Sequence, residues 1–313
     1  MKIVYMGTPD FAVAPLQALL RAGHEILCVI SQPDRPAGRK MELRPTAVKA
    51  AALAAGLPVW QPERIREAAC LEKLSAMAPE LIVVTAYGQL LPREVLELPR
   101  YGCLNVHASL LPAYRGAAPI QWAVINRDRV SGVSIMQMDE GLDTGAVLAR
   151  REVVLAPDET GGSLFDRLSE AGAELLAETV AALPSGRLTA EEQPAESPTA
   201  YARMLTRADG ELDWRMEAGR LEALIRGLDP WPSAGTRLHG KKLKVWKAAV
   251  CGTESGMSPG TVTAAGPEGI LVQTGKGQLL LTEVQPEGKK RMKAADFLRG
   301  HPLKAGDRME QGC

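Results

Sequence analysis

The chain has 313 residues, of which 46% are hydrophobic and 24% charged, proportions that are typical of a globular protein and argue against disorder. Its length predicts one large or two ordinary domains. No apolar run has the length of a membrane span, and the N-terminal sequence turns polar too soon for a signal peptide. Five cysteines without paired spacing favour free thiols over a disulfide framework or a zinc site. We therefore expect a cytoplasmic protein without a bound metal.

The net charge of zero conceals two oppositely charged parts of the chain. Residues 1–202 contain 19 Lys and Arg against 24 Asp and Glu, a balance of −5 (19 minus 24). Residues 203–313 contain 18 against 13, a balance of +5 (18 minus 13). A basic C-terminal part suits contact with a polyanion such as nucleic acid, although an imbalance of this size also arises by chance.

The N-terminal pattern predicts a strand, a helix and a second strand in succession. Lys2–Met6 and Ile26–Ile30 are short apolar runs, and Phe11–Leu20 suits a helix that Thr8 or Asp10 would cap. This order predicts an α/β fold with a Rossmann-like, doubly wound and mostly parallel sheet. The first turn has a single glycine where the dinucleotide fingerprint needs three, so we do not expect NAD to bind.

A basic segment follows the second expected strand. Residues 32–45 contain three prolines, one glycine and four basic residues, which predicts an exposed, mobile loop. It is either a plain connection or a loop that grips substrate. Further elements are expected as strands over 81–85, 102–106, 132–138 and 146–155 and as helices over 46–55, 117–126 and 162–183, the last capped near Thr160.

The pattern changes near residue 184, which predicts the end of a first domain spanning 1–184. Residues 185–204 are rich in Pro, Ser, Glu and Thr without periodicity, and we expect a linker there. Residues 205–313 would form a second domain that begins with a helix over 216–228. Short segments with Gly and Pro turns then predict a small β-barrel of the oligonucleotide-binding (OB) type, with strands over 234–238, 243–249, 260–264, 269–274 and 278–284.

The strongest candidate for chemistry begins at Asn105. On a strand, Asn105 and His107 share one face, at the sheet edge where open parallel sheets bind ligands. A histidine exchanges protons near neutral pH, and an asparagine amide donates a hydrogen bond to a developing oxyanion. Asp143, in an acidic loop bounded by glycines, would orient the imidazole. Because the Gly-x-Ser-x-Gly elbow is absent, the residues favour attack by an external nucleophile on a bound acyl donor.

Each of these residues also has a purely structural interpretation. A lone histidine after a strand is more often a satisfied structural residue than a catalyst. Asp143 between glycines suits an Asx turn, and Ser109–Pro112 suits an ordinary turn. Taken one at a time, the local signals are weak.

Taken together, several motifs carry a resemblance. They are Gly7-Thr8-Pro9-Asp10-Phe11-Ala12, Gln32-Pro33-Asp34-Arg35, Asn105-Val106-His107-Ala108-Ser109-Leu110-Leu111-Pro112, Arg115-Gly116 and Asp143-Thr144-Gly145. In this order they closely resemble the methionyl-tRNA formyltransferase family. The Asn, the His-x-Ser-Leu-Leu-Pro and the Asp are shared more widely with enzymes that use 10-formyltetrahydrofolate. The narrower family is indicated by the N-terminal motif, the basic loop, Asp229-Pro230-Trp231-Pro232 and Lys244-Val245-Trp246.

This resemblance covers nearly the whole chain and implies an activity. The formyl group of 10-formyltetrahydrofolate, a co-substrate, would pass to the α-amino group of initiator methionyl-tRNA, giving N-formylmethionyl-tRNA for translation initiation. The resemblance implies that Asn105 holds the formyl oxygen and that His107 stabilises or protonates the oxyanion. Asp143 would orient His107 and assist proton removal from the amine.

The resemblance also implies binding residues. Phe11 would help define the methionyl pocket, and Arg39 would grip the tRNA acceptor end. Because the loop is filled differently from the commonest family loop, Lys40 and Arg44 are alternatives to Arg39. The C-terminal barrel would contact tRNA phosphates. Part of the folate site would be formed by Ser109, Leu110, Leu111 and Pro112.

Two rival functions stay open on the sequence. Another folate-dependent N-formyltransferase or hydrolase would keep Asn105, His107 and Asp143 but would not need the basic loop and barrel. A non-catalytic RNA-binding protein would need the barrel but leaves those three residues unexplained. We expect a monomer, because the sequence contains no coiled coil or evident dimer motif.

Overall fold

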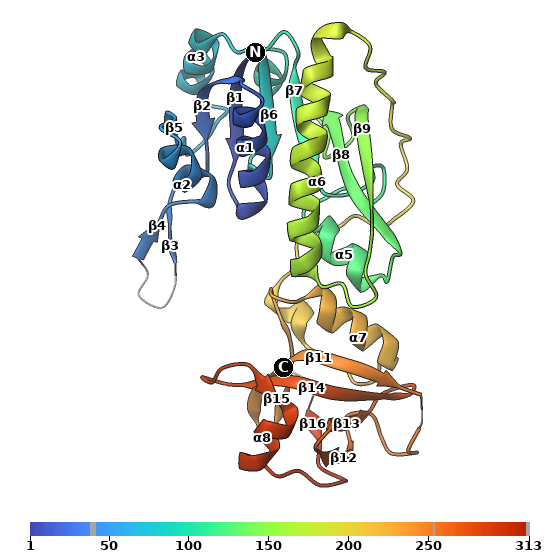
Figure 1. The fold of residues 1–313 in the computed structure, drawn as a ribbon. Coiled ribbons are helices and arrows are strands. Elements are labelled where there is room, and N and C mark those ends of the chain that lie inside the picture. The colour runs from blue at the N-terminus through green and yellow to red at the C-terminus, as the bar shows by residue number, and fades with distance from the viewer. Residues whose placement is uncertain (38–41, 253, 311–313) are drawn as a thin grey trace. The chain divides into compact units, whose positions relative to one another are not determined.

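The computed structural model describes residues 1–37, 42–252 and 254–310. The chain forms two compact units (Figure 1). The first consists of Met1–Pro119, Val130–Val154 and Phe165–Ala202, and the second of Ile120–Arg129, Leu155–Leu164 and Arg203–Cys313. The second unit therefore includes two short segments that precede residue 184, which no sequence pattern indicated.

A seven-stranded sheet forms the centre of the first unit. Its order is β5-β2-β1-β6-β7-β8-β9. The strands from β5 to β7 are parallel, whereas β8 and β9 continue the sheet in antiparallel pairing. The expected Rossmann-like, mostly parallel sheet is confirmed. The strands are β1 (Lys2–Gly7), β2 (Glu25–Ile30), β5 (Val59–Trp60), β6 (Leu81–Thr85), β7 (Cys103–His107), β8 (Val130–Gln137) and β9 (Val147–Val154).

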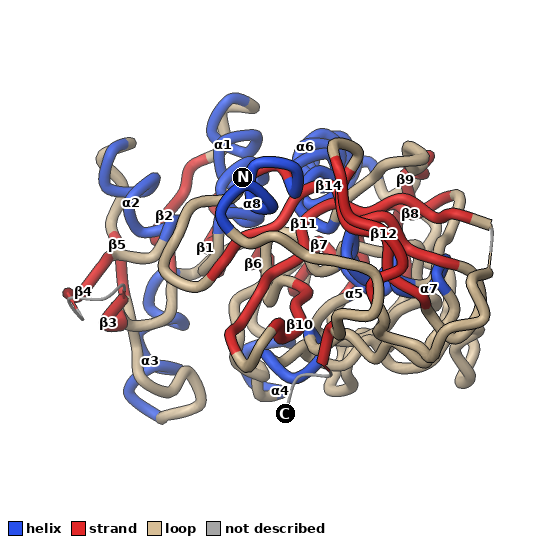
Figure 2. The backbone as a smooth tube through the Cα atoms, turned by 90° about the horizontal axis from the view of Figure 1, so that it is seen from below, coloured by secondary structure: helices blue, strands red, loops and turns tan. Residues whose placement is uncertain are grey.

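Helices cover both faces of this sheet, which is why its central strands are continuously apolar. Figure 2 shows α1 and α6 on one side of the strands and α3 and α4 on the other. Side chains of β1 alternate accordingly: Val4 and Met6 pack in the cluster that includes residues of α3 and α4, whereas the Tyr5 hydroxyl donates to the Ala12 carbonyl before α1 (2.6 Å). The helices are α1 (Val13–Arg21), α2 (Ala47–Ala54), α3 (Ala68–Met77), α4 (Arg93–Leu96) and α6 (Gly161–Ala182), with 3-10 turns η1 (Asp10–Ala12) and η2 (Leu183–Ser185).

The first helix begins differently from the prediction. Pro9 occupies the N-cap position of η1, and no side chain caps η1 or α1. The Thr8 hydroxyl instead donates to the Tyr87 carbonyl (2.9 Å) and so ties the first turn to the loop after β6. The predicted capping role of Thr8 or Asp10 is therefore wrong. Near α6 the prediction is confirmed, because Thr160 Oγ1 accepts the Ser163 amide (3.0 Å).

The segment over 32–45 contains regular structure where a loop was expected. Strands β3 (Arg35–Ala37) and β4 (Glu42–Arg44) pair antiparallel and form a separate two-stranded hairpin. Arg35 lies opposite Arg44, so two cations face each other at the base of the hairpin. Each strand has only three residues, too few for a period of two to be recognised in the sequence.

The second unit is built on an antiparallel sheet in the order β12-β13-β14-β11-β10-β16, with β15 on β14. Register shifts in β11 near Trp246 mark a bulge, which increases the local twist and curls such a sheet. The OB-like architecture is confirmed. Its elements are β10 (Ala234–Leu238), β11 (Lys241–Cys251), β12 (Val262–Gly266), β13 (Gly269–Gln273), β14 (Gln278–Pro286), β15 (Met292–Lys293), β16 (Met309–Glu310), α5 (Pro119–Ile125), η3 (Arg207–Gly210), α7 (Ala218–Gly227) and α8 (Ala294–Gly300). In the described ranges no helix is both long and apolar enough to cross a membrane.

Candidate active site

Strand β7 brings two of the candidate residues to the carboxyl end of the parallel strands. Asn105 and His107 are two residues apart on β7, so they lie on one face, as the alternation predicts. Cys103 shares this face and packs in the core cluster with residues of α3 and α4. His107 is only 6% exposed, and Asn105 is partly exposed. A rigid strand therefore carries both groups, one of them almost removed from water.

The imidazole of His107 faces an acceptor at each ring nitrogen. Nδ1 lies 3.6 Å from Asp143 Oδ1, and Nε2 lies 3.0 Å from the Tyr114 carbonyl oxygen. A carbonyl oxygen only accepts, so Nε2 carries hydrogen in this arrangement, and only the imidazolium donates to both neighbours. The first distance is longer than a hydrogen bond. Nδ1 and Asp143 Oδ1 therefore lie close together without a hydrogen bond between them.

Asp143 is held in an unusual backbone conformation. Its φ is +57°, in the left-handed region that costs a non-glycine residue about 1–3 kcal/mol. Its Oδ2 accepts the Gly116 amide at 2.9 Å, which turns Oδ1 toward His107. The Asx-type bond of this loop belongs to Asp139, whose Oδ1 accepts the Gly141 amide (3.0 Å). The carboxylate of Asp143 is therefore directed at the histidine rather than used to close its own turn.

The turn expected to bind folate is shaped by buried groups. Ser109 and Leu111 are each 1% exposed. The Ser109 hydroxyl donates to the Ala113 carbonyl (2.6 Å), and the Ser134 hydroxyl donates to the Ser109 carbonyl (2.7 Å). Leu110 and Pro112 are the members left partly exposed. The contact of this turn with folate stays a prediction, and only Leu110 and Pro112 offer side-chain surface for it.

The residues assigned to methionyl-tRNA have different locations. Phe11 is 4% exposed and packs edge-on against Phe165, with ring centroids 5.4 Å apart. This is a core contact, and a role in the methionyl pocket stays a prediction. Arg39 and Lys40 lie outside the described residues. No group of three or more His, Cys, Asp or Glu side chains within the described chain is arranged to hold a metal ion.

The base of the basic hairpin is tied to the sheet by a network that the sequence did not indicate. Lys49 Nζ donates to Asp34 Oδ2 (2.5 Å) and to Gln61 Oε1 (2.7 Å). Gln61 Nε2 donates to Asp34 Oδ1 (2.8 Å) and to the Gln32 carbonyl (2.7 Å). The bonds from Lys49 and Gln61 hold the pKa of the Asp34 carboxyl below its ordinary value. Asp34 thus anchors the chain where it enters β3.

A second group of contacts comes from residues 191–202, which we call the strap. They overlap the segment expected to be a linker, yet they bond to both loops of the candidate site. The Ser197 hydroxyl donates to the Pro112 carbonyl (2.8 Å), and Thr199 Oγ1 accepts the Tyr114 amide (2.7 Å). Gln193 bonds to the loop of Asp143. Composition alone could not reveal these contacts, because a polar aperiodic segment indicates only the absence of a helix or strand.

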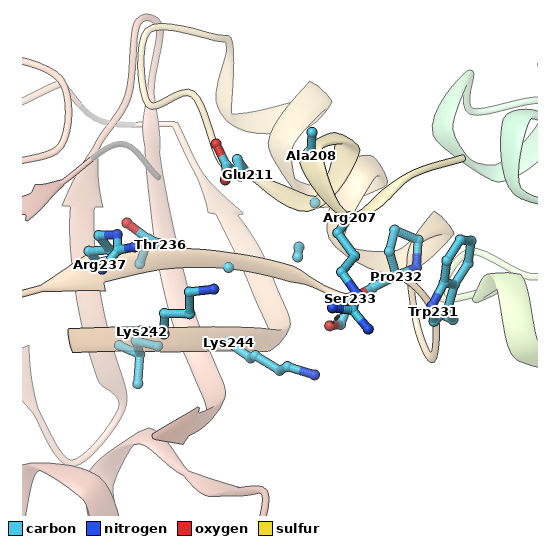
Figure 3. Close-up of a pocket in the computed structure, with 14 residues that line it drawn as sticks. Arg207, Ala208, Glu211, Trp231, Pro232, Ser233, Thr236, Arg237, Lys242 and Lys244 are labelled. Carbon is cyan, nitrogen blue, oxygen red and sulfur yellow. Dashed lines mark hydrogen bonds between the residues drawn. The ribbon is translucent and has the colours of Figure 1, made fainter. Parts of the chain in front are cut away.

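The second unit contains a basic pocket of about 480 Å³. In Figure 3, Arg237 on β10 and Lys242 and Lys244 on β11 approach it from the sheet, and Arg207 of η3 from the facing segment. Trp231, which is 52% exposed, borders it. Arg237 and Lys242 are direct cross-strand partners, and like charges in that arrangement repel each other. A bound anion would relieve this repulsion.

Comparison with known proteins identifies relatives for both units. Residues 1–180 match the family model described as formyl transferase, and residues 204–302 match the formyl transferase C-terminal domain. The methionyl-tRNA formyltransferase of Agathobacter rectalis is 51% identical over 307 residues, covering 98% of each chain. That of Desulfotalea psychrophila is 51% identical over 305 residues, covering 97% of this chain and 94% of the relative.

Solved structures of lower identity share the fold. HypX from Aquifex aeolicus, in complex with tetrahydrofolic acid, aligns with a TM-score of 0.64 at 18% identity, covering 99% of this chain and 50% of HypX. The chain thus spans about half the length of HypX. WlaRD, a sugar 3N-formyl transferase, aligns with a TM-score of 0.66 at 15% identity, covering 93% of this chain and 99% of WlaRD. Since both family models and half of the residues are shared over nearly the full length, this chain belongs to the methionyl-tRNA formyltransferase family of formyl-transferring enzymes.

Proposed function

We propose that this chain transfers the formyl group of 10-formyltetrahydrofolate to the α-amino group of initiator methionyl-tRNA. The observation that carries the proposal is the position of Asp143 beside the buried His107, with Oδ1 3.6 Å from Nδ1. His107 ends β7, two residues after Asn105. His107 and Asp143 offer a proton carrier, and Asn105 offers a neutral donor on the face of β7 that carries His107. We infer the acceptor, methionyl-tRNA, and the reaction, formyl transfer, from the two methionyl-tRNA formyltransferases that are 51% identical to this chain.

The residues divide the reaction between them. The amine nitrogen attacks the formyl carbon, the new C–N bond forms, and the bond between that carbon and N10 of the folate breaks. Asn105 donates its amide hydrogen to the formyl oxygen as negative charge develops there, a contact whose removal costs about 10²–10³-fold in rate in a characterised enzyme. The His107–Asp143 pair accepts the proton that the amine loses, and N10 of the leaving tetrahydrofolate gains one. No residue forms a covalent intermediate.

Burial supports these roles. His107 is 6% exposed, so its electrostatic interaction with Asp143 is weakly screened compared with a surface pair. The strand fixes Asn105 and His107 relative to each other, because two residues of one strand keep their spacing. Such preorganisation is the largest contribution that a site of this kind makes to rate.

The basic pocket favours a tRNA acceptor over a small amine. A sugar, a nucleotide amine or water needs no contact with a second unit, whereas a tRNA presents a row of phosphates. Arg207, Arg237, Lys242 and Lys244 line one pocket, and the exposed ring of Trp231 offers a face on which a base or ribose can stack. We therefore assign this pocket to tRNA phosphates.

Replacing Lys242 and Lys244 with alanine is expected to weaken tRNA binding without changing turnover at saturation. Each lost phosphate contact lowers the slope of log Kd against log salt by about 1. The measurement is tRNA binding between low and high salt. Lys247→Ala is the matched control, because Lys247 lies on the same strand but is ion-paired with Glu283 (3.3 Å). An unchanged salt slope in the double variant would exclude this pocket from the tRNA contact.

The proposed function is tested by following a labelled formyl group. The purified chain is given labelled 10-formyltetrahydrofolate with methionyl-tRNA, free methionine or water alone as acceptor. We expect label in the tRNA fraction as N-formylmethionyl-tRNA, with negligible formylation of methionine or release of formate. Preferential formate release would support a hydrolase, transfer only to a small amine another formyltransferase, and tRNA binding without transfer a non-catalytic protein.

A further inference from the structure

The side chain of Gln193, at the start of the strap, bridges two loops of the candidate site. Its Nε2 donates to the carbonyl oxygens of Asp143 (3.0 Å) and Gly145 (2.7 Å). Its Oε1 accepts from Arg115 at Nε (3.1 Å) and Nη2 (3.0 Å). A glutamine amide has two N–H donors and two lone pairs on its oxygen, so these four bonds use its entire capacity.

The orientation of this amide is fixed by its neighbours. Backbone carbonyls only accept and a guanidinium only donates, so exchanging the amide oxygen and nitrogen would break every bond. Arg115 is itself 8% exposed and also donates to the carbonyls of Pro194 (2.7 Å) and Ala195 (3.0 Å). The Arg115 side chain is therefore fixed by hydrogen bonds to three residues of the strap, which are Gln193, Pro194 and Ala195.

This bridge connects the two segments whose spacing sets the position of Asp143. Gly116, next to Arg115, donates its amide to Asp143 Oδ2 (2.9 Å). The carbonyls bound by Gln193 belong to Asp143 itself and to Gly145, so they hold the C-terminal side of the left-handed turn at Asp143, where φ is +57°. A strained backbone of this kind persists only where surrounding contacts hold it. Without the bonds from Gln193, the C-terminal side of this turn loses its support.

We infer that Gln193 is a positioning residue for formyl transfer: by binding the carbonyls of Asp143 and Gly145, it keeps the Asp143 carboxylate aimed at His107. The inference rests on the proposed function for its kinetic consequence. Gln193 touches neither reacting group, so it acts through Asp143. A displacement of about 1 Å at a catalytic group costs about 100-fold in rate.

Two substitutions separate the two halves of the bridge. Gln193→Met removes all four bonds, whereas Gln193→Glu keeps an acceptor for Arg115 but loses both donors to the Asp143 loop. We expect both variants to lower kcat by about 100-fold while KM for folate and for methionyl-tRNA stays within about twofold. Glu191→Gln is the control, because Glu191 lies in the same strap but its carboxylate binds Arg150 (2.6 Å).

A second readout does not depend on the reaction. When Asp143 moves, the Gly116 amide loses its acceptor, and its hydrogen exchange should become about tenfold faster in both variants. Loss of kcat in Gln193→Met alone would overturn the inference, because the contact with Arg115 would then be sufficient. Normal kcat and normal Gly116 exchange in both variants would overturn it as well. If the wild type transfers no formyl group, the proposed function fails, while the exchange rate still tests the positioning of Asp143.

Discussion

His107→Ala is expected to lower the turnover of formyl transfer by about 10²–10⁴-fold, the usual contribution of a positioned proton-transfer group. The substitution removes the imidazole whose Nδ1 lies 3.6 Å from Asp143 and leaves that carboxylate in place. Turnover is measured with both substrates saturating. tRNA affinity is expected to stay unchanged, because the basic pocket assigned to phosphates lies in the second unit and contains no atom of His107.

The buried position of His107 makes a control for folding necessary. Its Nε2 bonds to the Tyr114 carbonyl, and an alanine leaves that carbonyl without this donor at a cost of about 1–3 kcal/mol. His107→Gln restores an amide donor of similar length, so comparing the two variants separates stability from chemistry. Near-normal turnover in a folded His107→Gln would mean that no proton transfer at this position limits the reaction.

Gly145→Ala is expected to damage both stability and turnover. A Cβ at Gly145 would lie 1.8 Å from the backbone oxygen of Gln137 at the end of β8, so the loop has to move away from the sheet. Such overpacking lowers the free energy of unfolding by about 1–3 kcal/mol. Because Asp143 is two residues away, we also expect turnover to fall by about 100-fold. Denaturant unfolding and turnover below the unfolding transition measure the two effects.

Gly141→Ala is the matched control in the same loop. The Cβ there would meet the side-chain oxygen of Thr144 at 1.9 Å, and that hydroxyl can rotate away where a backbone oxygen cannot. The variant would lose the contacts of the Thr144 hydroxyl with the two carboxylate oxygens of Asp139 (2.8 and 2.9 Å). Equal losses in the two variants would show that the loop tolerates neither change, and that the approach of Gly145 to β8 does not determine the position of Asp143.

The inner parallel strands β1, β2, β6 and β7 follow from sequence because burial on both faces makes them largely apolar. β6 begins and ends where it was expected, at Leu81 and Thr85. α3 was missed because only Cys70 and Leu74 of its ten residues are buried, too few for a helical period. β15 and β16 have two residues each, too few for an alternating pattern, and β16 also depends on pairing with β10, far earlier in the chain.

The site was predictable only where one element carries it. Alternation along β7 placed Asn105 and His107 on one face. Asp143 lies in the loop between β8 and β9, so its approach to His107 depends on the pairing of strands far apart in sequence. Gln193 was assigned to a linker, because its partners are Arg115 and two backbone carbonyls, which lie about fifty to eighty residues earlier in the chain. Every residue has a main-chain carbonyl, so the residue types of the partners do not indicate a hydrogen bond to it.

The central claim is that His107 and Asp143 act as one unit, and a double-mutant cycle tests it most directly. The single-turnover rate of formyl transfer to methionyl-tRNA is measured for His107→Gln, Asp143→Asn and the double variant. Residues that act together are strongly non-additive, so the double variant is expected to be within about threefold of the slower single variant. A double variant whose loss equals the product of the two single losses would contradict the account, because the two residues would then act independently.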